Sequence, residues 1–129
     1  MTAGWLSDEW FALAADEASG LHGPPTLAGT VVVEVTGADA GDRAGHAIFA
    51  EGALVDAGPG TVAGADLTLT LTDADARAVV AGDLDPSVAF MRGRMKVTGA
   101  MAPLLDLLAL AGTEDARALL ARVAGATGF

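Results

Sequence analysis

Strict alternation of leucine and threonine over residues 67–72 limits the folds open to this 129-residue chain more than any other feature. In an extended strand, Leu67, Leu69 and Leu71 lie on one face and the intervening threonines lie on the other. A face made only of leucine belongs against a hydrophobic core. We therefore predict a strand from residue 66 to residue 72 with one buried face.

Four other segments have strand patterns. Valines alternate over residues 30–36, which is typical of a half-buried strand. Residues 43–50 and 53–57 are predicted as short strands joined by a tight turn, and such short connections favour an antiparallel meander. Residues 94–98 alternate again, with their odd-numbered members facing inward.

Helix-capping residues mark four of five predicted helices. Ser7, Thr72 and Thr113 each precede acidic residues that suit a helix start, and Asp85 precedes a proline suited to a first turn. The predicted helices cover residues 7–19, 72–82, 85–92, 101–111 and 113–125. This order of elements predicts an α+β fold, with helices over one face of a mostly antiparallel sheet. We also expect the helix pair before the last strand to let that strand insert away from its sequence neighbour.

Length and charge limit the classes of function. The chain suits a single domain, predicted to span residues 1–129, with an aliphatic core. A formal net charge of −10 with only seven basic residues argues against nucleic acid as a partner. The absence of cysteine excludes disulfides, thiolate metal sites and a cysteine nucleophile. The sequence has no recognisable secretion signal or membrane span, so we expect a cytoplasmic bacterial protein.

The polar residues form no recognisable catalytic or metal-binding pattern. His22 and His46 are the only histidines, and a metal site would need more ligands than this pair. The aspartate pairs 73/75 and 83/85 stand where helix starts and turns use carboxylates. We therefore predict no catalytic residue, no metal site and no cofactor.

Three segments carry a resemblance to a known family. In order and spacing, residues 65–73 (ADLTLTLTD), 82–86 (GDLDP) and 89–99 (AFMRGRMKVTG) resemble the sterol carrier protein type 2 family. The resemblance implies a five-stranded sheet covered by helices around an apolar tunnel that binds fatty acids, acyl-CoAs, sterols or other lipids. It implies carriage of a lipid more than chemistry on it. Members often have an aromatic residue in the second strand, where this chain has glycine, histidine and alanine at 45–47, so an altered cavity is expected.

Methionine and leucine adapt to irregular alkyl ligands, and this chain concentrates them after residue 89. We predict an apolar ligand site lined by Phe49, Phe90, Met91, Met95, Met101, Leu104, Leu105 and Leu108. Ordinary core packing is the alternative explanation for the same residues. Arg92, Arg94 and Lys96 are predicted to receive an anionic head group, or else to form a solvated outer face.

These observations predict reversible, non-catalytic binding of a hydrophobic small molecule. The alternative is an enzyme, or an accessory to one, that holds a hydrophobic biosynthetic intermediate in the same cavity. A third hypothesis is an interaction module whose tunnel is filled by side chains. A membrane or an enzyme is expected as a transient partner. Trp5, Trp10 and Phe11 would close one end of the cavity or touch that membrane, and burial against the sheet is the alternative explanation for them.

Overall fold

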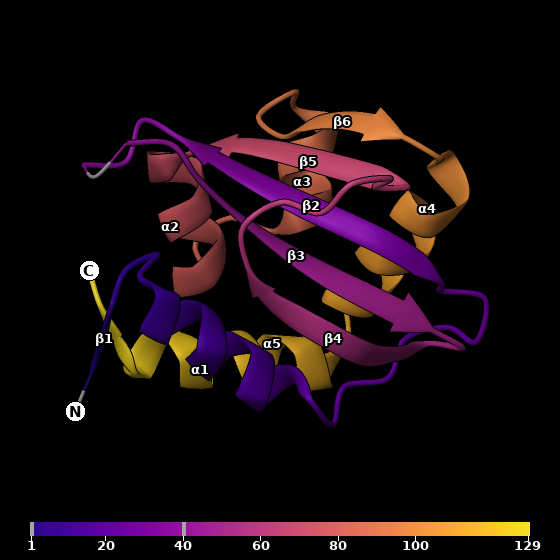
Figure 1. Ribbon diagram of the computed structural model, residues 1–129, viewed down its shortest axis with the longest axis horizontal. Helices are drawn as coiled ribbons and strands as arrows, with labels where there is room; N and C mark the ends of the chain where they lie inside the picture. The colour runs from indigo at the N-terminus through magenta and orange to yellow at the C-terminus, as the bar shows by residue number, and fades with distance from the viewer. Residues whose placement is uncertain (1, 40) are drawn as a thin grey trace.

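A five-stranded sheet forms one layer of the molecule, and helices form the other (Figure 1). The computed structural model describes residues 2–39 and 41–129. In chain order, the strands of this sheet are β2 (Gly29–Thr36), β3 (Arg43–Ala50), β4 (Ala53–Pro59), β5 (Leu67–Thr72) and β6 (Lys96–Gly99). In space, their order is β4-β3-β2-β5-β6. The predicted α+β fold with a five-stranded sheet is confirmed.

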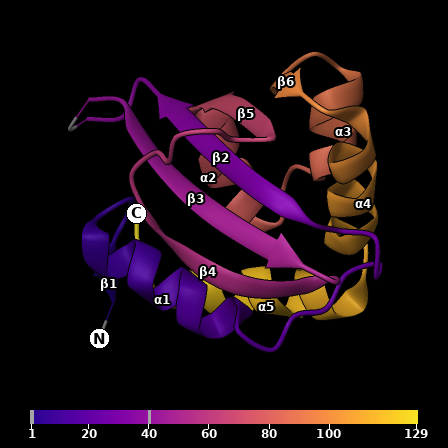
Figure 2. The same ribbon diagram turned by 45° about the vertical axis from the view of Figure 1, so that its right-hand side comes forward.

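The centre of this sheet is a parallel pair of strands. β2 and β5 run in the same direction, with Val33 opposite Leu69, and the other three pairings are antiparallel. β2, β3 and β4 form the predicted meander. The chain then reaches β5 through residues 60–66, which pass in front of β3 and β2 in both ribbon views (Figures 1 and 2).

The last strand of the sheet lies next to its sequence neighbour, so its predicted insertion elsewhere is wrong. β6 pairs with β5, with Val97 opposite Leu69. β2 already pairs with one edge of β5. The chain returns from the two helices that follow β5, and β6 then pairs with the edge of β5 that is still free. β6 also begins two residues later than predicted, because the N–H groups of Arg94 and Met95 donate to the carbonyl of Ala89.

Each predicted helix is present, and their bounds are α1 (Asp8–Ala18), α2 (Asp73–Ala81), α3 (Pro86–Met91), α4 (Met101–Ala111) and α5 (Glu114–Gly125). Ser7, Thr72, Asp85 and Thr113 accept hydrogen bonds from first-turn N–H groups, as predicted. These bonds satisfy donors that have no partner within the helix itself. Among the helices of the described ranges, none is long and apolar enough to cross a bilayer.

The helices gather on one side of the sheet, which Figure 2 shows from an oblique direction. Leu67, Leu69 and Leu71 are buried on this inner face of β5, together with Val31 and Val35 of β2. The threonines that alternate with the leucines are less buried. The hydrophobic core therefore lies between the inner face and the helices, as the alternation predicts.

The two ends of the chain meet in a second, small sheet. β1 (Ala3–Gly4) pairs in parallel with β7 (Thr127–Gly128), and strands this short have no pattern that a sequence could reveal. Beside them, the indole N–H of Trp10 donates to the hydroxyl of Thr127 at 2.9 Å. That hydroxyl donates in turn to the carbonyl of Val123 at 2.6 Å. These bonds tie α1 to the end of α5.

Gly99, which joins β6 to α4, should tolerate no side chain. Its φ is 121°, and a Cβ atom there would collide with the backbone oxygen of Asp66. We expect Gly99→Ala to lower the free energy of unfolding by about 3 kcal/mol, because backbone strain and a collision add. Gly93→Ala is the control, since Gly93 has a φ of 72° in open space and should cost about 1 kcal/mol. Urea unfolding measures both, and equal losses would contradict the role of the collision.

Candidate ligand-binding site

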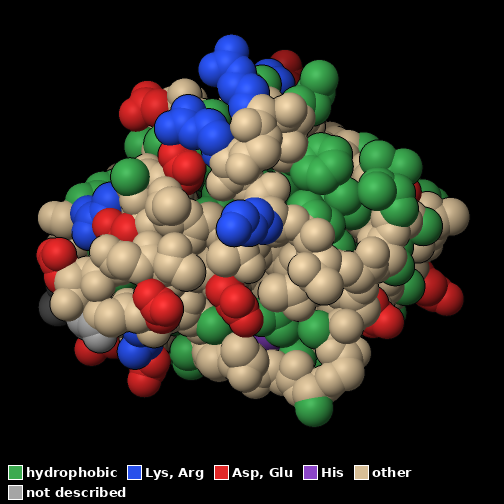
Figure 3. All heavy atoms as spheres, turned by 90° about the horizontal axis from the view of Figure 1, so that it is seen from above, with side chains coloured by type: hydrophobic (Ala, Val, Ile, Leu, Met, Phe, Trp, Pro, Cys, Tyr) green, Lys and Arg blue, Asp and Glu red, His purple; other side chains and the backbone are tan. Residues whose placement is uncertain are grey.

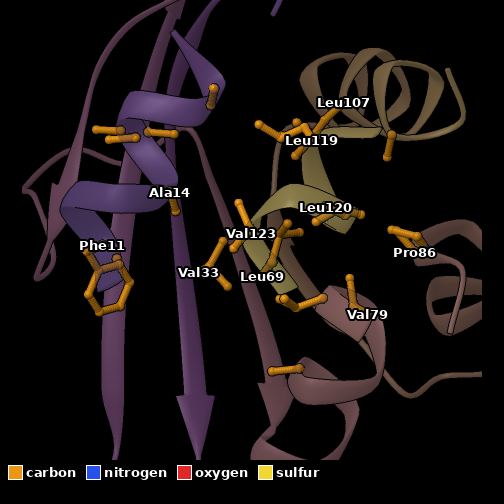
Figure 4. A pocket seen from close by; sticks show the side chains of 18 of the residues that line it. Phe11, Ala14, Val33, Leu69, Val79, Pro86, Leu107, Leu119, Leu120 and Val123 are labelled. Carbon is orange, nitrogen blue, oxygen red and sulfur yellow. The ribbon is translucent and has the colours of Figure 1, made fainter. Parts of the chain in front are cut away.

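A cavity of about 410 Å³ lies between the inner face of the sheet and helices α1, α2, α4 and α5 (Figure 4). Its volume falls within the range of roughly 300–1,000 Å³ that is typical of small-molecule pockets. Aliphatic and aromatic side chains make up nearly all of its lining. The cavity is therefore suited to a hydrophobic guest.

The sheet forms one wall of the cavity. Val33 and Val35 of β2 and Leu69 and Leu71 of β5 belong to this wall. Alternate residues of a strand share a face, and the parallel register sets Val33 beside Leu69. Figure 4 shows both of these side chains on the side of the sheet that faces Val123 of α5.

Small residues explain why space remains between the layers. α1 contributes Ala14, Ala15 and Ala18 to the lining, and β3 contributes Gly45 and Ala47. Longer side chains at these positions would fill the space, as they do in a close-packed core. The cavity thus results from the choice of small residues on two facing elements.

Phe11 of α1 brings an aromatic ring to a part of β3 that has none. A Cβ atom on Gly45 would collide with the Phe11 ring, so glycine lets this ring lie directly against the strand. An altered cavity is expected from the segment 45–47. This segment accommodates the aromatic ring of Phe11, which comes from α1.

Helices α2, α4 and α5 form the opposite wall. An apolar stripe of α5 contributes four lining residues, namely Ala116, Leu119, Leu120 and Val123. Val79 of α2, Leu107 of α4 and Pro86 at the start of α3 complete this side (Figure 4). The periodicity of apolar residues reveals such a stripe in the sequence. Periodicity does not distinguish a helix face that packs against other side chains from a face that borders a cavity.

Three of the eight residues predicted to contact a ligand line this cavity. Phe49 comes from β3, Met95 from the segment before β6 and Leu108 from α4. Phe49 and Met95 are buried, and Leu108 is half-buried. The structure brings these three together although they are far apart in the sequence.

The other five predicted residues do not line this cavity. Leu104 is fully buried, and Phe90 packs against the core. Met91, Met101 and Leu105 are 81%, 56% and 57% exposed, respectively. Helical geometry explains the case of Leu105, because successive residues turn by about 100° and a residue next to the buried Leu104 points elsewhere.

The basic residues predicted to hold a head group lie along the β6 edge of the molecule. Arg94 donates to the buried carboxylate of Asp75 at 2.7 Å. Arg92 and Lys96 are exposed. All three are outside the cavity lining.

Trp5, Trp10 and Phe11 line the cavity, and their rings cluster in a region here called its aromatic end. Trp5 and Trp10 meet edge to face with ring centroids 4.9 Å apart, and Trp10 and Phe11 meet in the same way at 5.2 Å. Phe129 packs on Trp5 at 5.2 Å. Such pairs add to the free energy gained from burial of the rings.

Asp73 holds the Trp5 ring in position. The indole N–H of Trp5 donates to one carboxylate oxygen at 2.8 Å, and Nε of Arg77 donates to the other at 2.7 Å. Burial by itself raises the pKa of Asp73. The hydrogen bonds from Trp5 and Arg77 and the charge of Arg77 outweigh burial and hold this pKa below its ordinary value.

Polar groups are scarce in the cavity wall. Among residues 2–39 and 41–129, His46 is the one titratable lining residue, and its Nδ1 lies 3.1 Å from the carbonyl oxygen of Gly60. Over the same residues, every buried polar side-chain atom has a hydrogen-bond partner. The described part of the chain also has no group of His, Cys, Asp or Glu that could hold a metal ion. A guest would therefore be held mainly by apolar contact.

A comparison with protein-family models assigns the chain to a family. The model of the SCP-2 sterol transfer family matches residues 24–112. The chain belongs to this family. The matched residues include all strands of the five-stranded sheet, whereas α1 and α5, which also line the cavity, lie outside the match.

Solved structures of SCP-2 proteins share the fold. A crystal structure of sterol carrier protein 2 is 21% identical, covers 93% of this chain and 96% of its own, and has a TM-score of 0.69. A conserved hypothetical protein of Thermus thermophilus, suggested to be a sterol carrier protein, is 22% identical, with coverages of 99% and 97% and a TM-score of 0.71. Palmitated SCP2L2 of Aedes aegypti is 18% identical, with coverages of 70% and 78% and a TM-score of 0.58. A comparison with curated protein sequences finds no match.

Asp73→Asn should weaken the aromatic end of the cavity and change the response of the protein to acid. At neutral pH we expect a loss of about 1–2 kcal/mol in the free energy of unfolding, because hydrogen bonds to a charged group become neutral ones. Since folding lowers this pKa, the ionised Asp73 stabilises the wild type above the ordinary pKa, and this stability disappears as the pH falls through the folded-state pKa.

Urea unfolding at pH 7 and near pH 3 measures this effect, and the gap between variant and wild type should narrow in acid. Asp83→Asn removes an exposed carboxylate and serves as the control. A gap of the same size at both pH values would contradict the role of the Asp73 charge.

Proposed function

We propose that this protein binds one lipid molecule with a long apolar chain and carries it without catalysing a reaction. The observation that carries the proposal is a cavity of about 410 Å³, almost wholly apolar, in a member of the SCP-2 sterol transfer family. Fatty acids and acyl-CoAs are the ligands that the cavity suits best. Sterol-like molecules belong to the same class of apolar guests.

The volume of the cavity matches one acyl chain. If a methylene needs about the volume that a water molecule has in the liquid, roughly 30 Å³, then roughly 14 methylenes fill the cavity. At about 0.8 kcal/mol for each buried methylene, such a chain gains roughly 11 kcal/mol. Loss of freedom on binding costs about 4 kcal/mol or more. The remaining 7 kcal/mol corresponds to a dissociation constant of the order of 10 μM.

The polar head group of the ligand should stay outside the cavity. An ionised carboxylate inside an apolar wall would lose its hydration without gaining a partner. One solved relative with this fold is described as palmitated, which agrees with an acyl chain as the guest.

Phe49, Met95 and Leu108 are proposed to contact the ligand, together with the alanines of α1. Entry of a ligand with a long chain is proposed to involve movement of part of the wall. The terminal helices α1 and α5 are the proposed moving parts. The hydrogen bond from Trp10 to Thr127 links α1 to the strand that follows α5. This bond would persist if the two helices move together and would break if they separate.

The same proposal treats residues 1–129 as one lipid-binding domain that acts in the cytoplasm. A role as an enzyme, or as an accessory that holds a hydrophobic biosynthetic intermediate, would use the same cavity. Chemical conversion of a bound compound, instead of its unchanged release, is the result that would identify that role.

Native mass spectrometry of the purified protein, followed by lipid analysis after denaturation, tests the proposal. We expect a stoichiometric lipid, or binding of added fatty acid or acyl-CoA to the apo protein. A clean apo mass that stays unchanged with all of these ligands would overturn lipid carriage.

Ala14→Phe should block the cavity. Ala14 points into the space in Figure 4, so a phenylalanine ring at this position takes up volume that the ligand needs. We expect binding of a fluorescent fatty acid to weaken at least tenfold, with a change of less than about 1 kcal/mol in stability because the ring enters a void.

Ala12→Phe is the matched control for this substitution. Ala12 is exposed on the same helix and does not belong to the lining, so the same added ring should leave binding unchanged. Equal weakening in both variants would show that the site lies elsewhere.

A further inference from the structure

The outer side of α4 is apolar although it faces solvent. Met101, Leu105 and Ala109 are exposed and recur every four residues, so they form one row along the helix. A surface helix ordinarily has polar residues on such a row. Asp106, the charged residue of α4, accepts a hydrogen bond from the hydroxyl of Thr26 at 2.7 Å.

Basic residues border this row along the edge of the sheet. Arg92 and Lys96 are exposed, and Arg94 is held by Asp75 with about half of its side chain exposed. Met91, the most exposed of the large apolar side chains, ends α3 beside them. Figure 3 looks down on β6 and α4 and shows Lys and Arg side chains next to an area of hydrophobic ones.

Charge is distributed unevenly along the chain. Residues 86–105 contain three basic residues and no acidic residue. The whole chain carries 17 acidic and 7 basic residues, so the other four basic residues share the rest of the chain with every acidic one. Basic residues gathered in one segment of a strongly negative protein favour approach of that segment to an anionic surface.

We propose that Met91, Arg92, Lys96, Met101 and Leu105 form a surface, here called the β6 surface, that docks the protein on an anionic lipid bilayer. Exposed methionine and leucine side chains enter the boundary between head groups and acyl chains, and the cations contact lipid phosphates and carboxylates. A bilayer of this kind satisfies both the apolar and the basic side chains. The negative charge of the remaining chain keeps the contact weak and reversible.

This inference rests on the proposed function for its purpose, since a lipid carrier must meet the membrane that donates or receives its ligand. The position of the β6 surface suits that purpose. The outer row of α4 belongs to the surface, while Leu107 and Leu108 of the same helix line the cavity. The bilayer would therefore lie against the outside of one cavity wall.

Flotation with lipid vesicles tests the docking surface on the full chain. Wild-type protein should bind vesicles of phosphatidylcholine mixed with phosphatidylserine, bind vesicles of phosphatidylcholine alone much less, and dissociate as salt is raised. Lys96→Gln should weaken binding about fivefold, because one cation near an anionic surface is lost. Leu105→Gln should weaken it by roughly five- to tenfold.

Matched controls separate this surface from general effects of charge and hydrophobicity. Arg117→Gln removes an exposed cation from α5, which lies on the side of the molecule opposite β6 (Figure 1). Val55→Gln removes an apolar side chain of β4 that is 59% exposed. Both should change vesicle binding less than twofold. Equal effects of the paired variants, or equal binding to neutral and anionic vesicles, would overturn the proposal.

Three further outcomes distinguish a bilayer from a second copy of the chain, and docking from carriage. A dimer in solution that Leu105→Gln disrupts, without any vesicle binding, would assign the surface to a second copy of the chain and overturn membrane docking. Binding of fluorescent fatty acid without vesicle binding would overturn docking alone. Vesicle binding without uptake of any lipid would support docking and overturn carriage.

Discussion

β2 and β5 run side by side in the same direction at the centre of the sheet, and this pairing decides what the rest of the chain can do. It joins the valines of one strand to the leucines of the other in a single apolar face that helices must cover. A parallel pair cannot be closed by a tight turn, so the chain crosses the sheet between β4 and β5. With one edge of β5 occupied, β6 has only the outer edge left. The basic and apolar side chains next to β6 therefore reach the surface as a consequence of a pairing at the centre.

The space between the sheet and the helices reflects two opposed requirements. A close-packed interior gains dispersion energy, and a void forfeits those contacts. Here alanines on α1 leave space between the layers unfilled, while Trp5, Trp10 and Phe11 pack edge to face in its aromatic part. The hydrogen bonds of Trp10 and Asp73 hold the side chains of that part together. A ligand that fills the void stabilises the folded state through its binding free energy.

Local signals in the sequence were sufficient to predict the helices and the strands of the five-stranded sheet. They were insufficient to predict which of these elements lie next to one another. The leucine–threonine alternation and the caps at Ser7, Thr72, Asp85 and Thr113 depend on neighbouring residues, and the structure confirms each of them. The neighbour of β6 depends on which edge of β5 is free, which is a property of the whole sheet. For the cavity, Phe49, Met95 and Leu108 were found by side-chain type. The alanines of α1 were missed because a small residue marks a void only once the facing wall is known.

Helix α4 shows why side-chain type alone did not place Met101, Leu104 and Leu105 correctly relative to the cavity. It is apolar on almost all sides, and such a composition suits a helix that is buried all round. In the fold, α4 lies at the edge of the molecule, where Leu104 and Leu110 are buried and Leu107 and Leu108 border the cavity. The helix continues to turn by about 100° per residue, so Met101 and Leu105 emerge on the other side. An edge helix with two apolar faces exposes apolar surface to water, and contact with another apolar phase would lower the free energy of that surface.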